Sequence, residues 1–146
     1  MKVHEILDEK GRRVVTARAD ECLLDAARRL STERVGALIV VDETLSPVGV
    51  LSERDIVRML NLQPKSVAAI PVGEAMTHGV IVARPDDEVE SVRVTMTERR
   101  IRHVPIVTNG AIVGLISIGD VLKALHQETN TENHRLRDYI SGKYLD

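Results

Sequence analysis

Two copies of a short motif contain the residues of this chain whose types and spacing best suit ligand binding. One copy ends in Ser52 and Asp55, and the other ends in Ser117 and Asp120. Both copies read Val-Gly, two apolar residues, Ser, two variable residues and Asp, and counterparts lie 65 positions apart. An internal repeat of this kind indicates two structural units of the same design.

The chemistry of the motif suits a phosphorylated sugar. The serine opens a helix, whose first backbone N–H groups are free to attract phosphate. The aspartate lies one turn further on, where its carboxylate can accept hydrogen bonds from the two adjacent hydroxyls of a ribose. The same spacing is also a capping box, which only closes the helix end. We favour nucleotide binding because the motif occurs twice, each time after a glycine that permits close approach; the serine can cap while the aspartate faces a ligand.

Arg54 stands between Ser52 and Asp55 and could reach a phosphate, whereas its counterpart is Gly119. The alternative for Arg54 is a solvated helix residue, and the sequence favours neither. The two clefts are therefore not expected to be equivalent.

The densest basic cluster of the chain consists of Arg99, Arg100, Arg102 and His103. A guanidinium binds phosphate through two hydrogen bonds, and histidine adds a donor whose charge varies near neutral pH. Arg102 and His103 align with Gly36 and Ala37 of the first unit. We therefore expect the better phosphate subsite at Arg102 and His103; the alternative is a solvated run at the start of a strand.

The pattern of each unit predicts the order β-α-β-β-α. Short β-branched runs at 14–16 and 80–82 predict a strand, and Asp20 and Asp86 are predicted as N-caps of the following helices. The apolar faces of these two helices are Leu23, Ala27 and Leu30, and then Val89, Val92 and Met96. Apolar runs at 38–41, 48–51, 104–107 and 112–116 predict strands covered on both faces, and Ser52 and Ser117 open the closing helices.

These elements predict an α+β fold with a first repeat at 1–63, a second at 64–126 and a helical tail at 127–146. Each half alone has too small a core, so the halves are expected to pack about a pseudo-twofold axis. In the tail, Leu136, Tyr139 and Ile140 form a stripe that is expected to dock on the two repeats or on a second copy of the chain.

Composition excludes several classes of protein. The net charge of −2 argues against binding of nucleic acid or of an anionic membrane through bulk charge, and no apolar run approaches a membrane span. The first residues lack the apolar core of a signal peptide. Cys22 is the only cysteine, which rules out an internal disulfide and favours a cytoplasmic setting. With 1% aromatic residues, a flat ligand ring would have to lie between aliphatic side chains and backbone.

The chain resembles a tandem pair of CBS domains, often called a Bateman module, over residues 3–125. The resemblance rests on residues 49–55 and 114–120, on 102–106 and on 74–77. It implies a regulatory module that binds AMP, ADP, ATP, NAD or S-adenosylmethionine between the repeats, and pairs that associate as homodimers. The sequence at 139–142 also resembles the tail of small stand-alone proteins of this family.

The resemblance and the motifs together predict the ligand-binding residues. In the family, the stretch at Thr16 and Val82 flanks the adenine, with backbone groups near Ala17 and Ala83 reading its edge. The alternative for these side chains is an ordinary strand role. The predicted residues are Thr16, Ala17, Ala37, Ser52, Arg54, Asp55, Val82, Ala83, Arg102, His103, Pro105, Ser117 and Asp120.

Enzyme chemistry is not expected. The five histidines lack metal-ligand spacing, no phosphate-binding glycine loop or nucleophile elbow occurs, and Cys22 has no base beside it in the alignment of the units. No metal is predicted. We expect a sensor that binds an adenosine nucleotide and regulates an unknown partner protein; the alternative is a dimerisation or adaptor protein with vestigial clefts.

Overall fold

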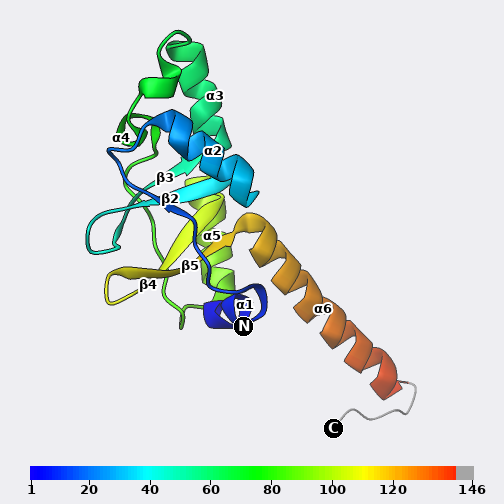
Figure 1. Ribbon diagram of the computed structural model, residues 1–146. Helices are drawn as coiled ribbons and strands as arrows, with labels where there is room; N and C mark the ends of the chain where they lie inside the picture. The colour runs from blue at the N-terminus through cyan, green and yellow to red at the C-terminus, as the bar shows by residue number, and fades with distance from the viewer. Residues whose placement is uncertain (141–146) are drawn as a thin grey trace.

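The computed structural model describes residues 1–140, and side chains up to residue 130, as two similar units that lie one above the other (Figure 1). The first unit contains β1 (Thr16–Ala17), α2 (Leu23–Glu33), β2 (Ala37–Val41), β3 (Pro47–Ser52) and α3 (Glu53–Leu62). The second contains α5 (Val89–Arg99), β4 (His103–Thr108), β5 (Ala111–Ser117) and α6 (Ile118–Ile140). Two short helices, α1 (Val3–Lys10) and α4 (Val72–Ala75), and a 3-10 turn, η1 (Val67–Ala69), complete the fold. The predicted α+β fold with two repeats is confirmed.

The hairpins of the two units are built alike and place the motif serines at equivalent points. β2 and β3 are antiparallel with Ala37 opposite Ser52, and β4 and β5 are antiparallel with His103 opposite Ser117. In each hairpin the pairing register shifts toward the end of the first strand, at Val40/Val41 and at Ile106/Val107. Each motif serine therefore ends a strand and begins a helix, as the sequence predicts.

The strand predicted at 80–82 is wrong: these three residues form no strand, and the neighbouring Ala83 makes an isolated parallel bridge to Ile106. In the first unit, the Ile39 N–H donates to the carbonyl of Val15 (3.1 Å) and extends the pairing of β1 with β2. The counterpart of Ile39 is Pro105, which has no N–H to donate. Residues 80–82 therefore leave the sheet, and β4 and β5 form a sheet of two strands.

The predicted N-caps Asp20 and Asp86 are also wrong. Cys22 and Glu88 occupy the cap positions of α2 and α5, and neither makes a side-chain cap hydrogen bond. The first N–H group of each helix is instead bonded by a distant carbonyl: that of Leu23 by Ile70 (2.8 Å), and that of Val89 by Met1 (2.9 Å). Pairing with a remote segment thus replaces the local cap.

The buried faces of these helices differ from the prediction at one position. Leu23 and Leu30 of α2 are buried as expected, but Ala26 rather than Ala27 is the alanine that faces the core. The face of α5, formed by Val89, Val92 and Met96, is as predicted.

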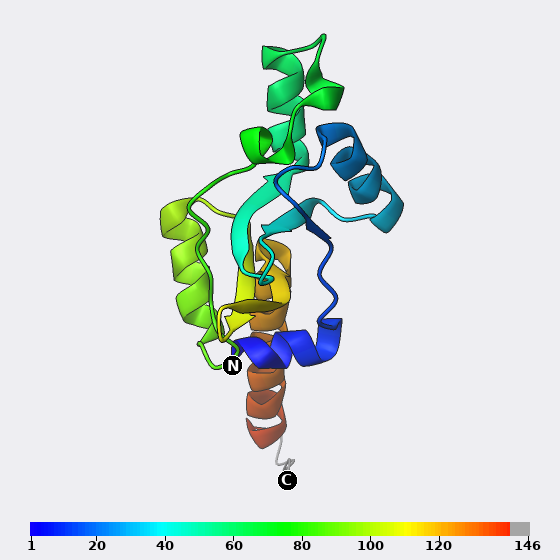
Figure 2. The ribbon, with the colours of Figure 1, turned by 60° about the vertical axis from the view of Figure 1, so that its left-hand side comes forward.

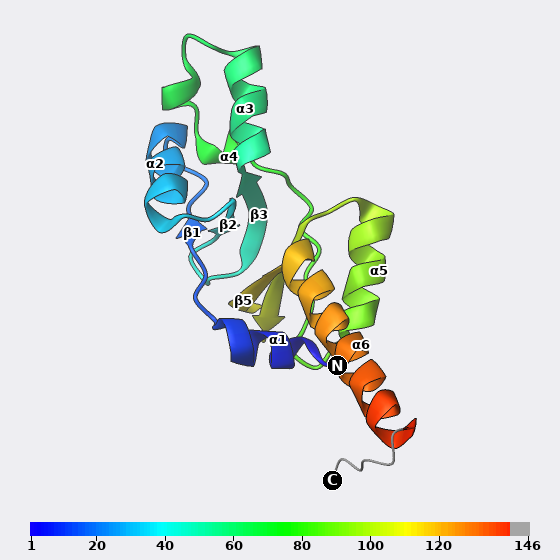
Figure 3. The ribbon, with the colours of Figure 1, turned by 90° about the vertical axis from the view of Figure 1, so that its right-hand side faces the viewer.

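The opening helices cross over between the halves. Val3, Ile6 and Leu7 of α1 belong to the core of the second unit, whereas Val72 and Ala75 of α4 belong to the core of the first. Figures 1 and 3 show α1 beside β5 and α4 beside α3. Each packed half therefore contains the opening helix of the other sequence repeat.

The motif glycines make room for these crossing segments. A Cβ atom at Gly49 would overlap the side chain of Met76, and a Cβ atom at Gly114 would lie 2.8 Å from both methyl groups of Leu7. The segment that packs closely against each of these glycines is therefore a neighbouring side chain of the protein, Met76 or Leu7.

Helix α6 continues beyond the second unit and projects away from the rest of the fold (Figures 1 and 2). The expected stripe of Leu136, Tyr139 and Ile140 lies outside the residues whose side chains are described. Among the described residues, no helix is long and apolar enough to cross a membrane.

Candidate functional site

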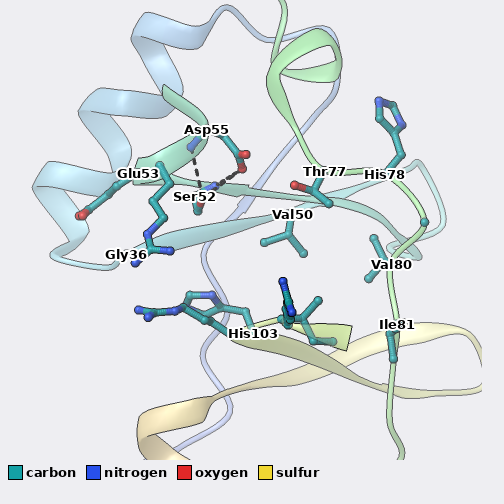
Figure 4. Close-up of a pocket in the computed structure, with 15 residues that line it drawn as sticks. Gly36, Val50, Ser52, Glu53, Asp55, Thr77, His78, Val80, Ile81 and His103 are labelled. Atoms are coloured by element: carbon teal, nitrogen blue, oxygen red, sulfur yellow. Dashed lines mark hydrogen bonds between the residues drawn. The ribbon is translucent and has the colours of Figure 1, made fainter. Parts of the chain in front are cut away.

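A cavity of about 430 Å³ lies between the two units, within the usual size range of small-molecule sites. Its walls come from three segments: the first unit, the linker after α4, and the start of β4 (Figure 4). The lining residues are Gly36, Val50, Ser52, Glu53, Arg54, Asp55, Thr77, His78, Gly79, Val80, Ile81, Arg100, Ile101, Arg102 and His103.

Ser52 and Asp55 form a complete capping box at the start of α3, on one side of this cavity (Figure 4). The Asp55 N–H donates to Ser52 Oγ (3.3 Å), and Asp55 Oδ2 accepts from Ser52 N (2.9 Å) and Ser52 Oγ (3.1 Å). Asp55 Oδ1 lies 3.1 Å from a guanidinium nitrogen of Arg58. Asp55 is 5% exposed, and three of the about four acceptor positions of its carboxylate are filled by the Ser52 N–H, the Ser52 hydroxyl and Arg58, so one is left for a group in the cavity.

The second motif forms the same box, but its aspartate has another partner. Asp120 Oδ2 accepts from Ser117 N (2.8 Å), and the Asp120 N–H donates to Ser117 Oγ (3.1 Å). Lys10 Nζ donates to Asp120 Oδ2 (2.7 Å) and to the carbonyl of Leu115 (3.0 Å). Burial alone would raise the pKa of Asp120, but the bonds from Lys10 and Ser117 outweigh it and lower that pKa.

Positive charge lines the cavity from both units. Arg100 and Arg102 line it from the second unit, and Arg54 lines it from the start of α3. His103 lies below the aspartate in Figure 4, across the cavity. Burial lowers the pKa of His103, nearby Lys10 and Arg102 lower it further, and Asp120 opposes them. His103 is therefore neutral at pH 7, and the three guanidinium groups supply the positive charge.

The structure thus brings together five of the predicted residues, from both units: Ser52, Arg54, Asp55, Arg102 and His103. Ser117 and Asp120 lie apart from this cavity, with Lys10. Arg99, the remaining member of the basic cluster, is not among the lining residues.

The other predicted residues lie within or beside the sheets. Ala17 and Ala37 are buried, and the carbonyl of Thr16 accepts a hydrogen bond from Arg29 (2.8 Å). The N–H of Ala83 donates to Pro105 (3.0 Å), and its carbonyl accepts from Val107 (2.9 Å), so neither group is free for an adenine edge.

Val82 is 43% exposed and lines a separate cavity of about 100 Å³ beside α5. Contact of Thr16, Ala17, Ala37, Val82, Ala83 and Pro105 with a ligand stays a prediction.

The sequence predicts aliphatic walls for a ligand ring but not the residues that form them. Val50 and Ile101 face the cavity from the two units, and Val80 and Ile81 line it from the linker. Figure 4 shows Val50, Val80 and Ile81 around the space between Asp55 and His103. The β-branched run at 80–82 is the signal for the linker residues, although its pattern also predicts a strand.

Among the residues with described side chains, no group of three or more His, Cys, Asp or Glu residues could hold a metal ion. Cys22 is partly buried at the cap position of α2.

Comparisons with known proteins find the same two-unit architecture. The CBS domain family matches residues 4–62 and 72–127. The mitochondrial CBS domain-containing protein CBSX3 of Arabidopsis thaliana is 32% identical over 97% of this chain and 73% of its own length. The crystal structure of the CBS-domain containing protein ATU1752 from Agrobacterium tumefaciens is 37% identical, with a TM-score of 0.79 over 84% of this chain and 92% of that chain.

Two further similar structures contain adenosine compounds. The CBS domain pair of protein MJ0100, in complex with 5'-methylthioadenosine and S-adenosyl-L-methionine, is 28% identical, with a TM-score of 0.77 over 88% of this chain and 98% of that one. CBSX2 in complex with AMP is 26% identical, with a TM-score of 0.69 over 80% of this chain and 90% of that one.

Proposed function

Because the chain belongs to the CBS-domain family, we propose that it is a non-catalytic regulatory module that binds a phosphorylated adenosine nucleotide, such as AMP, ADP, ATP or NAD. The site is the cavity between the two repeats. The observation that carries the proposal is the meeting, in this one cavity, of the Asp55 carboxylate, the N-terminus of α3 and three arginines from both repeats.

Each part of such a ligand would contact a different group of residues in the cavity. A ribose hydroxyl is a donor for the carboxylate of Asp55, which keeps one acceptor position beside its bonds to Ser52 and Arg58. The phosphates suit the guanidinium groups of Arg54 and Arg102, since the N–H groups of Glu53 and Asp55 at the start of α3 are already bonded to Gly36 and Ser52. The adenine lies between Val50 and the linker residues Val80 and Ile81, since no Phe, Tyr or Trp lines the cavity.

The charge of the cavity favours a phosphorylated ligand over a cationic one. Arg54, Arg100 and Arg102 face two carboxylates, Glu53 and Asp55, and Asp55 is already paired with Arg58. The solved relatives bind AMP in one case and S-adenosyl-L-methionine with 5'-methylthioadenosine in another. The sulfonium charge of S-adenosylmethionine would stand among the arginines, whereas a phosphate would neutralise them.

Ligand contact with both repeats provides the signal. A molecule bound to Asp55 and Arg102 at once stabilises the arrangement of repeats that holds these groups together, and a partner protein would read that arrangement. The chain is expected to do this as a homodimer. Val57 and Leu60 of α3 and Leu122 of α6 are each at least half exposed, and Val57 and Leu122 are counterparts in the two repeats. Exposed apolar side chains that form a contiguous patch mark interaction surfaces, and Val57 and Leu60 lie one helical turn apart on α3.

A dimerisation or adaptor role without ligand is the second candidate function. The observation in its favour is that Asp120 is bonded by Lys10 and that Gly119 replaces the arginine found at position 54. The cytoplasmic location expected from the single cysteine stays a prediction, since the CBSX3 relative is mitochondrial.

Isothermal titration with AMP, ATP, NAD and S-adenosylmethionine tests the proposal. We expect at least one phosphorylated ligand to bind more tightly than S-adenosylmethionine. Arg102→Ala should weaken its binding about tenfold, since one charge-assisted hydrogen bond to phosphate is worth about 1.5 kcal/mol or more. Arg99→Ala is the matched control, because Arg99 belongs to the same basic cluster but does not line the cavity. No binding of any ligand, or equal losses from the two variants, would refute the proposal.

A further inference from the structure

The opening helices and the linkers that follow them differ near the two motif aspartates. Lys10 is the last residue of α1, whereas α4 ends at Ala75 and Gly79 follows it in the linker. Gly79 lines the open cavity, has a φ of +68°, and a Cβ built on it would meet no atom within 4 Å. The linker after α4 thus leaves its part of the Asp55 cavity open, whereas Lys10 at the end of α1 reaches Asp120.

Lys10 fills the equivalent space at Asp120. Its ammonium group donates to Asp120 Oδ2 at 2.7 Å and to the carbonyl of Leu115 at 3.0 Å. The counterpart of Leu115 is Val50, which lines the open cavity. The Lys10 side chain therefore crosses from the end of α1 to the two groups that correspond to the ribose-binding side of the open cavity.

The second motif also lacks one group for a phosphorylated ligand, because Gly119 stands where Arg54 stands in the first motif. Lys10 neutralises the Asp120 carboxylate within the chain. The ion pair is partly sheltered, with side-chain exposures of 37% for Lys10 and 24% for Asp120.

We propose that Lys10 closes the second cleft by holding the Asp120 carboxylate that would otherwise accept the ribose hydroxyls of a ligand. Each chain then binds one adenosine ligand, in the cavity at Asp55. This inference rests on the proposed function of that cavity. It identifies Lys10 as the residue that sets the number of ligands bound per chain.

Calorimetric titration of the full chain with adenosine and with AMP tests the inference through stoichiometry. Adenosine is included because it tests the ribose partner of the second cleft without any contribution from a phosphate. Wild type should bind one ligand per chain, and Lys10→Ala should bind a second, weaker adenosine. Lys10→Arg is the matched control, since it keeps the positive charge on Asp120, and it should bind one. The double variant Lys10→Ala with Asp120→Asn should return to one.

The outcomes separate this inference from the function on which it rests. Two ligands bound by wild type, or one bound by Lys10→Ala, would overturn the role of Lys10 while the nucleotide site stands. No binding by wild type or by any variant would overturn the proposed function and this inference with it. Melting curves establish that each variant is folded, and Lys10→Gly, which also removes the ammonium group, is the second opening variant if Lys10→Ala does not fold.

Discussion

Replacing Asp55 by alanine should reduce both stability and nucleotide affinity, because this one carboxylate has two roles. In the folded chain it accepts hydrogen bonds from the N–H and hydroxyl of Ser52 and pairs with Arg58. The variant leaves the partly buried N–H of Ser52 without its acceptor. A hydrogen bond to a charged group contributes about 1.5–3 kcal/mol, so we expect the free energy of unfolding to fall by about 2 kcal/mol.

Urea denaturation followed by far-ultraviolet circular dichroism measures the stability change, since the chain has no tryptophan for a fluorescence signal. A loss of about 2 kcal/mol corresponds to a melting temperature lower by about 4–8 °C for a chain of this size. Asp120→Ala is the matched control: it removes the same capping bond and the pair with Lys10. Both variants should unfold earlier, but only Asp55→Ala should weaken the binding of AMP.

Either half of this expectation can fail separately. An unchanged urea midpoint for Asp55→Ala would mean that the capping box contributes nothing to stability. Unchanged AMP affinity under conditions where the variant is folded would show that Asp55 does not hold the ribose. Equal losses of affinity from Asp55→Ala and Asp120→Ala would contradict a single working cleft.

Two further predictions follow from the packing and from the titration of the site. Gly49→Ala should destabilise the chain by about 1–3 kcal/mol in urea, because its Cβ would overlap Met76. Met76→Ala also destabilises the chain because Met76 is buried, but the loss in the double variant should be smaller than the sum of the two single losses; additive losses would refute the overlap. His103 has a lowered pKa, so the folded state binds fewer protons than the unfolded state just below pH 6.5, and stability should fall as the pH drops through that region; His103→Gln should flatten this dependence. Phosphate binding should favour protonated His103, so AMP affinity should rise as the pH falls from 8 to 6, and a pH-independent affinity would exclude contact between them.

The sequence predicts the repeated architecture because its signals are local. The apolar runs and the Ser-x-x-Asp spacing specify strands and helix starts within a few residues of each other, and these elements form as expected. The errors come from contacts between segments far apart in the chain. The first turns of α2 and α5 bond to Ile70 and Met1, which no pattern around Asp20 or Asp86 reveals.

The candidate site was predictable in its residue types but not in their pairing. Ser52, Arg54 and Asp55 lie in one motif, and their place beside Arg102 and His103 depends on how the repeats pack. Pro105 illustrates a signal that the sequence does contain: a proline at a strand position cannot donate, so the strand expected before it is shortened to one bridge. Its consequence is visible only once the pairing partner is known.

The capping geometry explains why two equal motifs need not mean two equal ligand sites. Ser117 and Asp120 are required to close the start of α6 whether or not a ligand binds, just as Ser52 and Asp55 close the start of α3. Helix capping alone therefore explains why the motif is present in both repeats. Binding is decided by what reaches the carboxylate: Asp55 is paired with Arg58, which does not line the cavity, whereas Asp120 is held by Lys10 of α1. An internal lysine costs the chain one ligand site and gives Asp120 a permanent counter-charge, so the two repeats can share a fold while only one of them keeps an open cleft.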